Sequence, residues 1–223
     1  MDSTLKCLIC HTTIIDELSF QTLFKPHPIL CESCTMTLKQ YKFNTENRCN
    51  YCLGKIERQQ CVNCTSRDYL YRFDSITACF HYDGFYKSLY HQYKFLGDVV
   101  LANVIAHAIR IPYHHFDMVI PVPSVEENDL KRTFNPVQTI LIAAKVPFQN
   151  CLKMNQRPKQ FTLNFKERIN LENGILIQGD IQLENKRILL IDDIYTTGQT
   201  AHNVAVKLFS KKVRKLSMLT FAR

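Results

Sequence analysis

The chain has 223 residues, of which 46% are hydrophobic and 22% charged, and its formal net charge is +8. This length accommodates one ordinary domain with its own core and a small additional module, and the composition is typical of globular rather than disordered proteins. The sequence has no run of 18 apolar residues and no apolar segment of a secretion signal near its start, so we expect a cytoplasmic protein without membrane insertion.

Eight of the ten cysteines lie in the first 66 residues, as four Cys-x-x-Cys pairs. Four thiolates in a tetrahedron are the usual ligands of a structural zinc ion, so two such pairs complete one site. The pairs therefore predict two zinc ions in a cysteine-rich module over residues 1–66. A disulfide framework is the alternative, but it is typical of secreted chains. The predicted zinc ligands are Cys7, Cys10, Cys31, Cys34, Cys49, Cys52, Cys61 and Cys64.

The pairing of these motifs is open from the sequence. Sequential pairing joins the first pair to the second across 20 residues and the third to the fourth across 8. Crossed pairing is also chemically sound, but we favour the sequential order because shorter loops lose less closure entropy. Four protein ligands leave no open position for catalysis, so we expect each zinc ion to replace a core that so short a segment cannot build.

From residue 69 onward, the apolar pattern alternates between the strand and helix types. Continuous apolar runs bounded by turn residues predict strands, and apolar residues three or four positions apart predict helices. Alternation of this kind, with continuous apolar strands, is typical of a parallel sheet covered on both faces. We therefore predict an α/β domain over residues 69–223. Strands are expected at 75–82, 118–123, 174–177, 187–191 and 216–221, and helices at 85–95, 101–109, 137–144 and 201–209.

Residues 188–201 are the most informative segment. Four apolar residues predict a buried strand, two carboxylates follow at its carboxyl end, and a short Thr/Gly loop leads into an amphipathic helix. Backbone N–H groups at a helix start bind phosphate, and Gly198 lets the backbone approach the anion closely. Asp192 and Asp193 are placed to accept hydrogen bonds from sugar hydroxyls, so a ribose 5-phosphate fits both halves of the pattern. Solvated acids beside a threonine-rich helix cap are the alternative.

The same segment is similar to the motif with which type I phosphoribosyltransferases bind phosphoribosyl pyrophosphate (PRPP). Nearly the whole chain resembles the ComF family of competence proteins, although Pro136 stands where the family usually has glutamine and residues 126–129 are acidic where it is usually basic. The resemblance rests on the four cysteine pairs, residues 93–98, 119–123 and 131–135, on Gln160, Leu163 and Arg168, and on the ending at 220–223.

The resemblance implies a type I phosphoribosyltransferase-like parallel sheet behind an N-terminal double zinc ribbon. Asp192 and Asp193 would contact the ribose hydroxyls, and Mg²⁺ would accompany PRPP by binding its phosphate oxygens. The 5-phosphate would be held by Thr196, Thr197, Gly198, Gln199 and Thr200. Residues 157–168 would form a flexible hood over the site. The candidate partners of the pyrophosphate charge are Lys94, Arg132, Arg157, Lys159 and Arg168.

Two functions follow from this resemblance. The first is a late competence factor that binds PRPP and supports the uptake and handling of single-stranded DNA in natural transformation, together with a helicase partner. The second is an active phosphoribosyltransferase that transfers phosphoribosyl to a base or another acceptor. No base-recognition loop is recognisable, which favours the first function.

The basic surplus lies in residues 67–223, which carry 21 Lys/Arg against 14 Asp/Glu, so a polyanion is expected to prefer that part.

Overall fold

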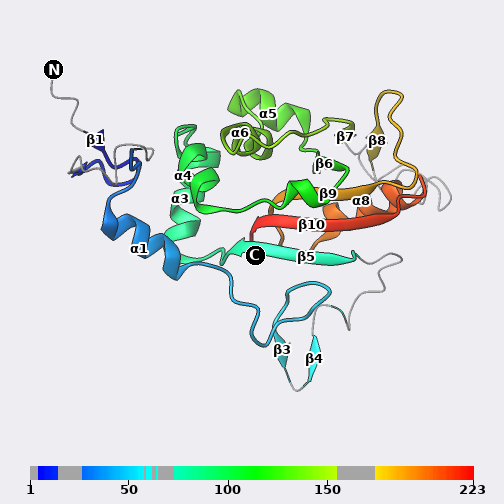
Figure 1. Ribbon diagram of the computed structural model, residues 1–223, viewed down its shortest axis with the longest axis horizontal. Helices are drawn as coiled ribbons and strands as arrows, with labels where there is room; N and C mark the ends of the chain where they lie inside the picture. The colour runs from blue at the N-terminus through cyan, green and yellow to red at the C-terminus, as the bar shows by residue number, and fades with distance from the viewer. Residues whose placement is uncertain (1–4, 15–26, 58, 62–63, 65–72, 155–173) are drawn as a thin grey trace, which may run out of the picture.

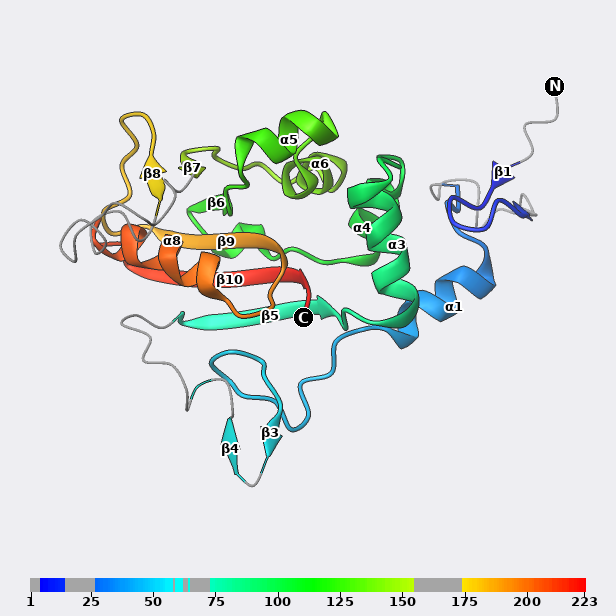
Figure 2. The ribbon, with the colours of Figure 1, turned by 180° about the vertical axis from the view of Figure 1, so that it is seen from behind.

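The protein is described by a computed structural model that covers residues 5–14, 27–57, 59–61, 64, 73–154 and 174–223. A four-stranded sheet occupies the centre, and helices cover both of its faces (Figures 1 and 2). The strand order is β5-β10-β9-β6, and every neighbouring pair is parallel, which confirms the predicted fold class. The strands are β5 (Ser75–Phe80), β6 (Met118–Pro121), β9 (Arg187–Ile194) and β10 (Lys215–Ala222).

The two central strands supply side chains to two separate cores, because successive residues of a strand point to opposite faces of the sheet. In β9, Leu189 and Ile191 pack in the first core, whereas Ile188 and Leu190 pack in the second. The strands are thus apolar on both faces, which is why they appear in the sequence as continuous apolar runs. The same alternation in β10 places Leu219 and Phe221 in the first core and Leu216 and Met218 in the second.

Different helices cover the two faces. The first core is closed by α3 (Gly84–Phe95), α4 (Leu101–Ala108) and α6 (Pro136–Ala143), and the second by α8 (Gln199–Phe209). These four helices match the four predicted ones to within a few residues. None of the helices in the described ranges is long and apolar enough to span a membrane.

One predicted strand lies outside the sheet, and three short elements between residues 113 and 154 were not predicted. Residues 174–177 contain β8 (Ile175–Ile177), but β8 pairs antiparallel with β7 (Leu152–Met154) in a separate two-stranded ribbon. A three-residue strand has too few side chains to show which partner it takes. The helix α5 (Glu126–Arg132) has no buried residue, so it has no apolar face that the sequence pattern could reveal. A short 3₁₀ helix, η1 (Tyr113–His115), precedes β6.

In its described residues, the cysteine-rich segment contains two small hairpins and a helix that lies between them. The hairpins are β1 (Leu5–Lys6) with β2 (Thr13–Ile14) and β3 (Ile56–Glu57) with β4 (Gln60–Cys61), and α1 (Glu32–Gln40) lies between them. The chain after α1 pairs with the end of β5, because the Phe43 amide donates to the Cys79 carbonyl at 3.0 Å and the His81 amide to the Tyr41 carbonyl at 2.8 Å. The predicted domain boundary at residues 66–69 falls outside the described residues and stays a prediction.

Candidate functional site

The site lies where β6 and β9 end side by side. The chain after β6 passes through α5 to α6, which packs in the first core, whereas α8, which follows β9, packs in the second. The chain therefore leaves the two neighbouring strands toward opposite faces of the sheet, and such a crevice at the carboxyl edge is where open α/β sheets bind ligands. We call this region the β6/β9 edge.

The loop of residues 195–198, here called the phosphate loop, joins β9 to α8. Gly198 caps the helix in a left-handed conformation, with φ of 74°. A Cβ atom at this position would lie 2.2 Å from the Tyr195 hydroxyl, so only glycine fits there. Tyr195 is buried and its hydroxyl lies 3.2 Å from His202 Nε2. The loop therefore wraps around the Tyr195 ring and presents the start of α8 at the β6/β9 edge.

The two aspartates predicted to bind ribose lie near the end of β9 and are partly buried. The Asp193 amide donates to Asp192 Oδ1 at 2.9 Å, and the Ile194 amide donates to Asp193 Oδ1 at 2.6 Å. Burial, followed by the negative charge of Asp193, raises the pKa of Asp192 to about 8. The Asp192 carboxyl is therefore mainly protonated at neutral pH, so it can donate a hydrogen bond as well as accept one.

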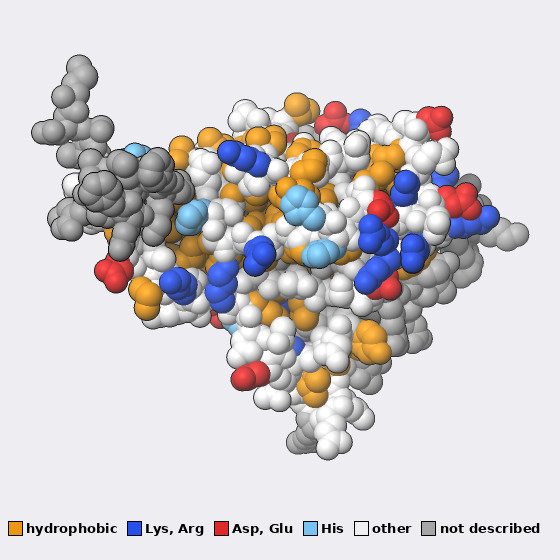
Figure 3. Space-filling model, viewed as in Figure 1, with side chains coloured by type: hydrophobic (Ala, Val, Ile, Leu, Met, Phe, Trp, Pro, Cys, Tyr) orange, Lys and Arg blue, Asp and Glu red, His pale blue; other side chains and the backbone are white. Residues whose placement is uncertain are grey.

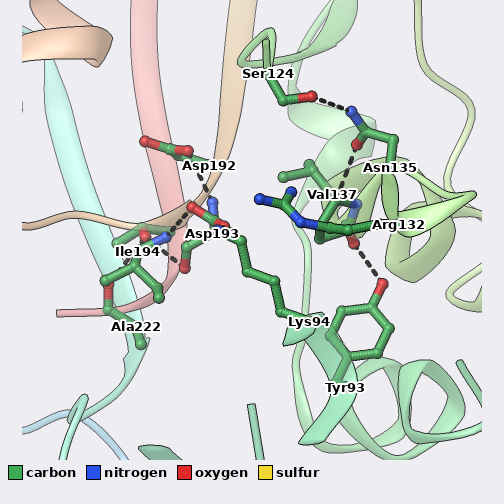
Figure 4. Close-up of polar contacts among 12 residues, drawn as sticks. Tyr93, Lys94, Ser124, Arg132, Asn135, Val137, Asp192, Asp193, Ile194 and Ala222 are labelled. Carbon is green, nitrogen blue, oxygen red and sulfur yellow. Dashed lines mark hydrogen bonds and ion pairs between the residues drawn. The ribbon is translucent and has the colours of Figure 1, made fainter. Parts of the chain in front are cut away.

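Two of the predicted basic residues point toward this pair from the other side of the crevice, and one of them contacts it (Figure 4). Lys94, in the last turn of α3, forms an ion pair with Asp193, and each side chain is 17% exposed. Arg132, at the end of α5, points toward the aspartates from the β6 side and stacks over Phe95 with its guanidinium 5.8 Å from the ring centroid. The structure thus brings two cations and the acid pair together, although they come from three separate elements.

A polar network that the sequence analysis did not identify holds the β6 side of the crevice. Asn135 caps α6, because its side-chain oxygen accepts from the Val137 and Gln138 amides at 3.1 and 3.0 Å. Its amide nitrogen donates to Ser124 Oγ and Asp129 Oδ2, both at 2.8 Å. The sequence Asn-Pro before an apolar helix is a signature of a helix start, and it could have pointed to this role. Pro136, unusual for the ComF family, is therefore suited to the first position of α6.

The acidic residues of α5, which depart from the family pattern, are all paired with bases. Glu126 contacts Lys153 at 2.7 Å and Glu127 contacts Lys131 at 2.7 Å. Asp129 contacts Arg132 at 3.7 Å. These acids therefore do not leave a free negative charge beside the crevice. The remaining predicted bases, Arg157, Lys159 and Arg168, belong to the predicted hood and lie outside the described residues.

The eight paired cysteines gather into two clusters, each of which could bind a metal ion. Cys7, Cys10, Cys31 and Cys34 form the first cluster, and Cys49, Cys52, Cys61 and Cys64 form the second, with all sulfur atoms of a cluster within 4.8 Å of one another. This grouping is the sequential one. None of the ten cysteines, all of which are described, forms a disulfide.

The sulfur geometry fits zinc. A tetrahedron with Zn–S bonds of about 2.3 Å places its sulfur atoms about 3.8 Å apart. Cys10 and Cys31 Sγ lie 3.6 Å apart in the first cluster, and Cys49 and Cys64 Sγ lie 3.7 Å apart in the second. Burial, with the neighbouring cysteines, raises the pKa of Cys34 and of Cys64 above the usual value. Four thiolates so close together need a cation to neutralise them, which a Zn²⁺ ion would supply.

The two clusters extend different cores. Cys7 and Cys34 of the first cluster pack in the first core, the one that contains α3 and α4. Cys49 and Cys52 of the second cluster pack in the second core, together with Tyr195 of the phosphate loop. The first cluster therefore lies on the α3 side of the sheet and the second on the α8 side.

Three curated proteins are similar to this chain over most of its length. Competence protein ComFC of Streptococcus pneumoniae is 29% identical over 210 residues, which cover 90% of this chain and 91% of that protein. Competence protein ComFC of Bacillus subtilis is 28% identical over 235 residues, which cover 97% and 94%. Competence protein F of Haemophilus influenzae is 24% identical over 212 residues, which cover 85% and 86%. These relatives confirm the resemblance to the ComF family, although no protein-family model matches the chain.

Solved structures with a partial likeness to this chain include phosphoribosyltransferases. The allosteric regulatory enzyme of purine biosynthesis shares 16% identity at a TM-score of 0.35, over 56% of this chain and 25% of that one. A hypoxanthine-guanine phosphoribosyltransferase from Bacillus anthracis shares 15% identity at a TM-score of 0.31, over 56% of this chain and 66% of that one. At these scores the likeness supports no conclusion about the chemistry of this chain.

Proposed function

We propose that this chain is a competence factor of the ComF type that binds PRPP at the β6/β9 edge and supports the handling of single-stranded DNA in natural transformation. One observation carries the proposal. The acid pair at the end of β9 runs directly into the phosphate loop and the start of α8, and Lys94 and Arg132 face this pair across the crevice. A sugar phosphate with a second anionic group has complementary chemistry.

Each part of PRPP has a partner in this arrangement. The 5-phosphate binds at the start of α8, where backbone N–H groups and the hydroxyls of Thr196, Thr197 and Thr200 surround an anion. The ribose hydroxyls bind Asp192 and Asp193, of which the first both donates and accepts hydrogen bonds. Lys94 and Arg132 bind the pyrophosphate, and Mg²⁺ bound to the phosphate oxygens neutralises its remaining charge.

The basic surface supports a role with nucleic acid. On the face shown in Figure 3, most Lys and Arg side chains lie in two groups, one on the left and one on the right, rather than in one concentrated patch. Charges spread in this way suit an extended polyanion. The affinity of such binding depends on the salt concentration more than on the nucleotide sequence. The relatives are competence proteins, which favours incoming single-stranded DNA as the polyanion and a helicase as the partner that delivers it.

Calorimetry on the full chain tests PRPP binding. PRPP with Mg²⁺ is expected to bind, ribose 5-phosphate to bind more weakly, and inorganic pyrophosphate more weakly still, because each lacks one part of the ligand. Thr200→Val is expected to weaken all ligands with a 5-phosphate, whereas Thr37→Val, on α1 and away from the crevice, serves as the control. Equal affinities of all three ligands would contradict the proposal.

Turnover distinguishes this function from that of an active transferase. The protein is incubated with PRPP, Mg²⁺ and each common base, and pyrophosphate release is measured. We expect binding without base-dependent release. Rapid release with one base would instead assign the chain to the phosphoribosyltransferases. Fluorescence anisotropy with a labelled oligonucleotide, across a salt series, then tests whether single-stranded DNA binds more tightly than the duplex.

A further inference from the structure

Arg223 connects two segments that are far apart in the sequence. Its Nε donates to the Cys52 carbonyl at 3.2 Å. Its Nη1 donates to the Tyr195 carbonyl at 3.2 Å and to the Thr196 carbonyl at 2.8 Å. The guanidinium also lies 5.4 Å from the centroid of the Tyr195 ring. One side chain thus joins the second cysteine cluster to the phosphate loop.

The backbone of Arg223 is held in place by two hydrogen bonds, which fixes the position from which the side chain extends. Its amide donates to the Phe80 carbonyl at 3.0 Å, and its carbonyl accepts from the Tyr82 amide at 3.0 Å. Arg223 therefore continues the pairing of β10 with β5 beyond the end of the strand. The planar guanidinium presents several donors in a rigid fork, which suits three carbonyl acceptors better than the single ammonium of lysine.

The contacts of Arg223 determine which way the phosphate loop faces. In a trans peptide, the carbonyl of one residue and the N–H of the next point in opposite directions. Because the Tyr195 and Thr196 carbonyls point toward Arg223, the N–H groups of Thr196 and Thr197 point away from it. These outward N–H groups are the donors that an anion at the loop would use.

The other end of the connection is fixed by the second cluster. Cys52 is buried, its Sγ lies 3.4 Å from Cys61 Sγ, and it accepts from the Gly54 amide at 3.4 Å. The Cys49 amide donates to the Gly54 carbonyl at 2.8 Å, which closes the turn around Cys52. A metal ion bound by these thiolates would hold the Cys52 sulfur, and the short turn transmits that restraint to the Cys52 carbonyl.

We propose that Arg223 is a positioning residue that couples metal binding at the second cysteine cluster to anion binding at the phosphate loop. This inference rests on the proposed function, since it assigns a control element to the same anion site. The coupling is reciprocal, because a ligand that changes the binding affinity of a second site has its own affinity changed by the same factor when the second site is occupied. A bound sugar phosphate therefore strengthens metal binding at the second cluster, and loss of that metal weakens sugar-phosphate binding. The first cluster makes no such contact with the loop in the described residues.

The test measures both directions on the zinc-loaded full chain. Ribose 5-phosphate affinity is measured by calorimetry for the wild type, Arg223→Gln and Arg223→Lys. Arg187→Gln is the matched control, since Arg187 also makes several bonds through its guanidinium, to Asp117 at the opposite end of β9. We expect Arg223→Gln to weaken binding roughly 10- to 100-fold, Arg223→Lys to recover part of it, and Arg187→Gln to bind like the wild type.

Zinc release to a chromophoric chelator gives a second measurement that needs no variant of Arg223. Ribose 5-phosphate is expected to slow the release of one zinc ion per chain several-fold. The variant Cys10→Ser, which disrupts the first cluster, identifies the protected ion as that of the second. This measurement decides the question even if Arg223→Gln fails to fold.

The outcomes separate the two proposals. A wild type that binds ribose 5-phosphate, with no protection of zinc and no loss of affinity in Arg223→Gln, overturns the coupling alone. A wild type that binds neither ribose 5-phosphate nor PRPP overturns the proposed function and the coupling together. Protection of zinc in the wild type that is absent in Arg223→Gln supports both.

Discussion

The two cysteine clusters have the same ligand set but different neighbours. Both use four cysteines in two Cys-x-x-Cys pairs, and their sulfur atoms are similarly spaced. The first cluster extends the core on the α3 side, whereas the second extends the core on the α8 side and contacts the phosphate loop through Arg223. Identical metal-binding motifs can therefore stabilise different parts of the fold, because each cluster packs against a different core.

Disrupting each cluster in turn gives the largest expected effects. Cys10→Ser and Cys61→Ser should each lower the zinc content from about two ions per chain to about one, since a tetrahedral site loses most of its affinity with one ligand. Only Cys61→Ser should also weaken ribose 5-phosphate binding strongly. Metal analysis and calorimetry measure the two quantities. A zinc content near zero in the reduced wild type would contradict both metal sites, and equal loss of binding in the two variants would contradict the difference between the clusters.

Removing the acid pair tests the proposed ligand site without touching a cysteine. Asp192→Asn with Asp193→Asn should weaken PRPP binding by about 1–3 kcal/mol for each lost hydrogen bond, with the larger losses at the charged Asp193 carboxylate. The zinc content and the fold should stay as in the wild type. Asp180→Asn, at an exposed position, is the control for a loss of one charge. Calorimetry gives the affinities, and an unchanged PRPP affinity would mean that the aspartates do not contact the ligand.

Two glycines with the same backbone conformation allow the α3 side and the α8 side of the sheet to be compared directly. Gly97, between α3 and α4, has φ of 76° and open space where a methyl group would lie, whereas Gly198 has φ of 74° and Tyr195 in the way. Gly97→Ala should cost about 1–2 kcal/mol of folding free energy from backbone strain alone. Gly198→Ala should cost about 1–3 kcal/mol more, from overpacking. Chemical denaturation measures both, and equal costs would show that Tyr195 moves aside easily.

The raised pKa of Asp192 predicts a smaller, pH-dependent effect. Folding keeps this carboxyl protonated above its usual pKa of about 3.9, so the wild type loses stability as the pH rises from about 4 toward 8. Asp192→Asn removes this penalty, and its stability relative to the wild type should increase by about 2–3 kcal/mol between pH 6 and pH 8.5.

Thermal unfolding of Asp192→Asn at these two pH values measures the change, which corresponds to several degrees for a chain of this size. Asp193→Asn is the contrasting variant. It removes the ion pair with Lys94 and should lower the melting temperature at both pH values. A relative stability of Asp192→Asn that does not change with pH would show that Asp192 titrates normally.

Much of the site could be predicted from the sequence because its residues are local. The aspartates, the phosphate loop and the start of α8 lie within residues 188–201, so chain order alone brings them together. The sequential cysteine pairing was favoured for a similar reason, since short loops close at low entropic cost. Lys94 and Arg132 were named by resemblance to a family, and only the fold shows that both of them face the aspartates.

The sequence by itself determined the alternation of strands and helices, the four Cys-x-x-Cys pairs and the position of the phosphate loop. Each of these follows from a local pattern, in apolar spacing, in Cys-x-x-Cys pairs or in turn chemistry. Only the tertiary structure decided that β8 leaves the sheet to pair with β7, that the two clusters join opposite cores, and that Arg223 links Cys52 to the phosphate loop. These contacts join residues up to 171 positions apart, and their geometry depends on how whole elements pack, which no local pattern encodes.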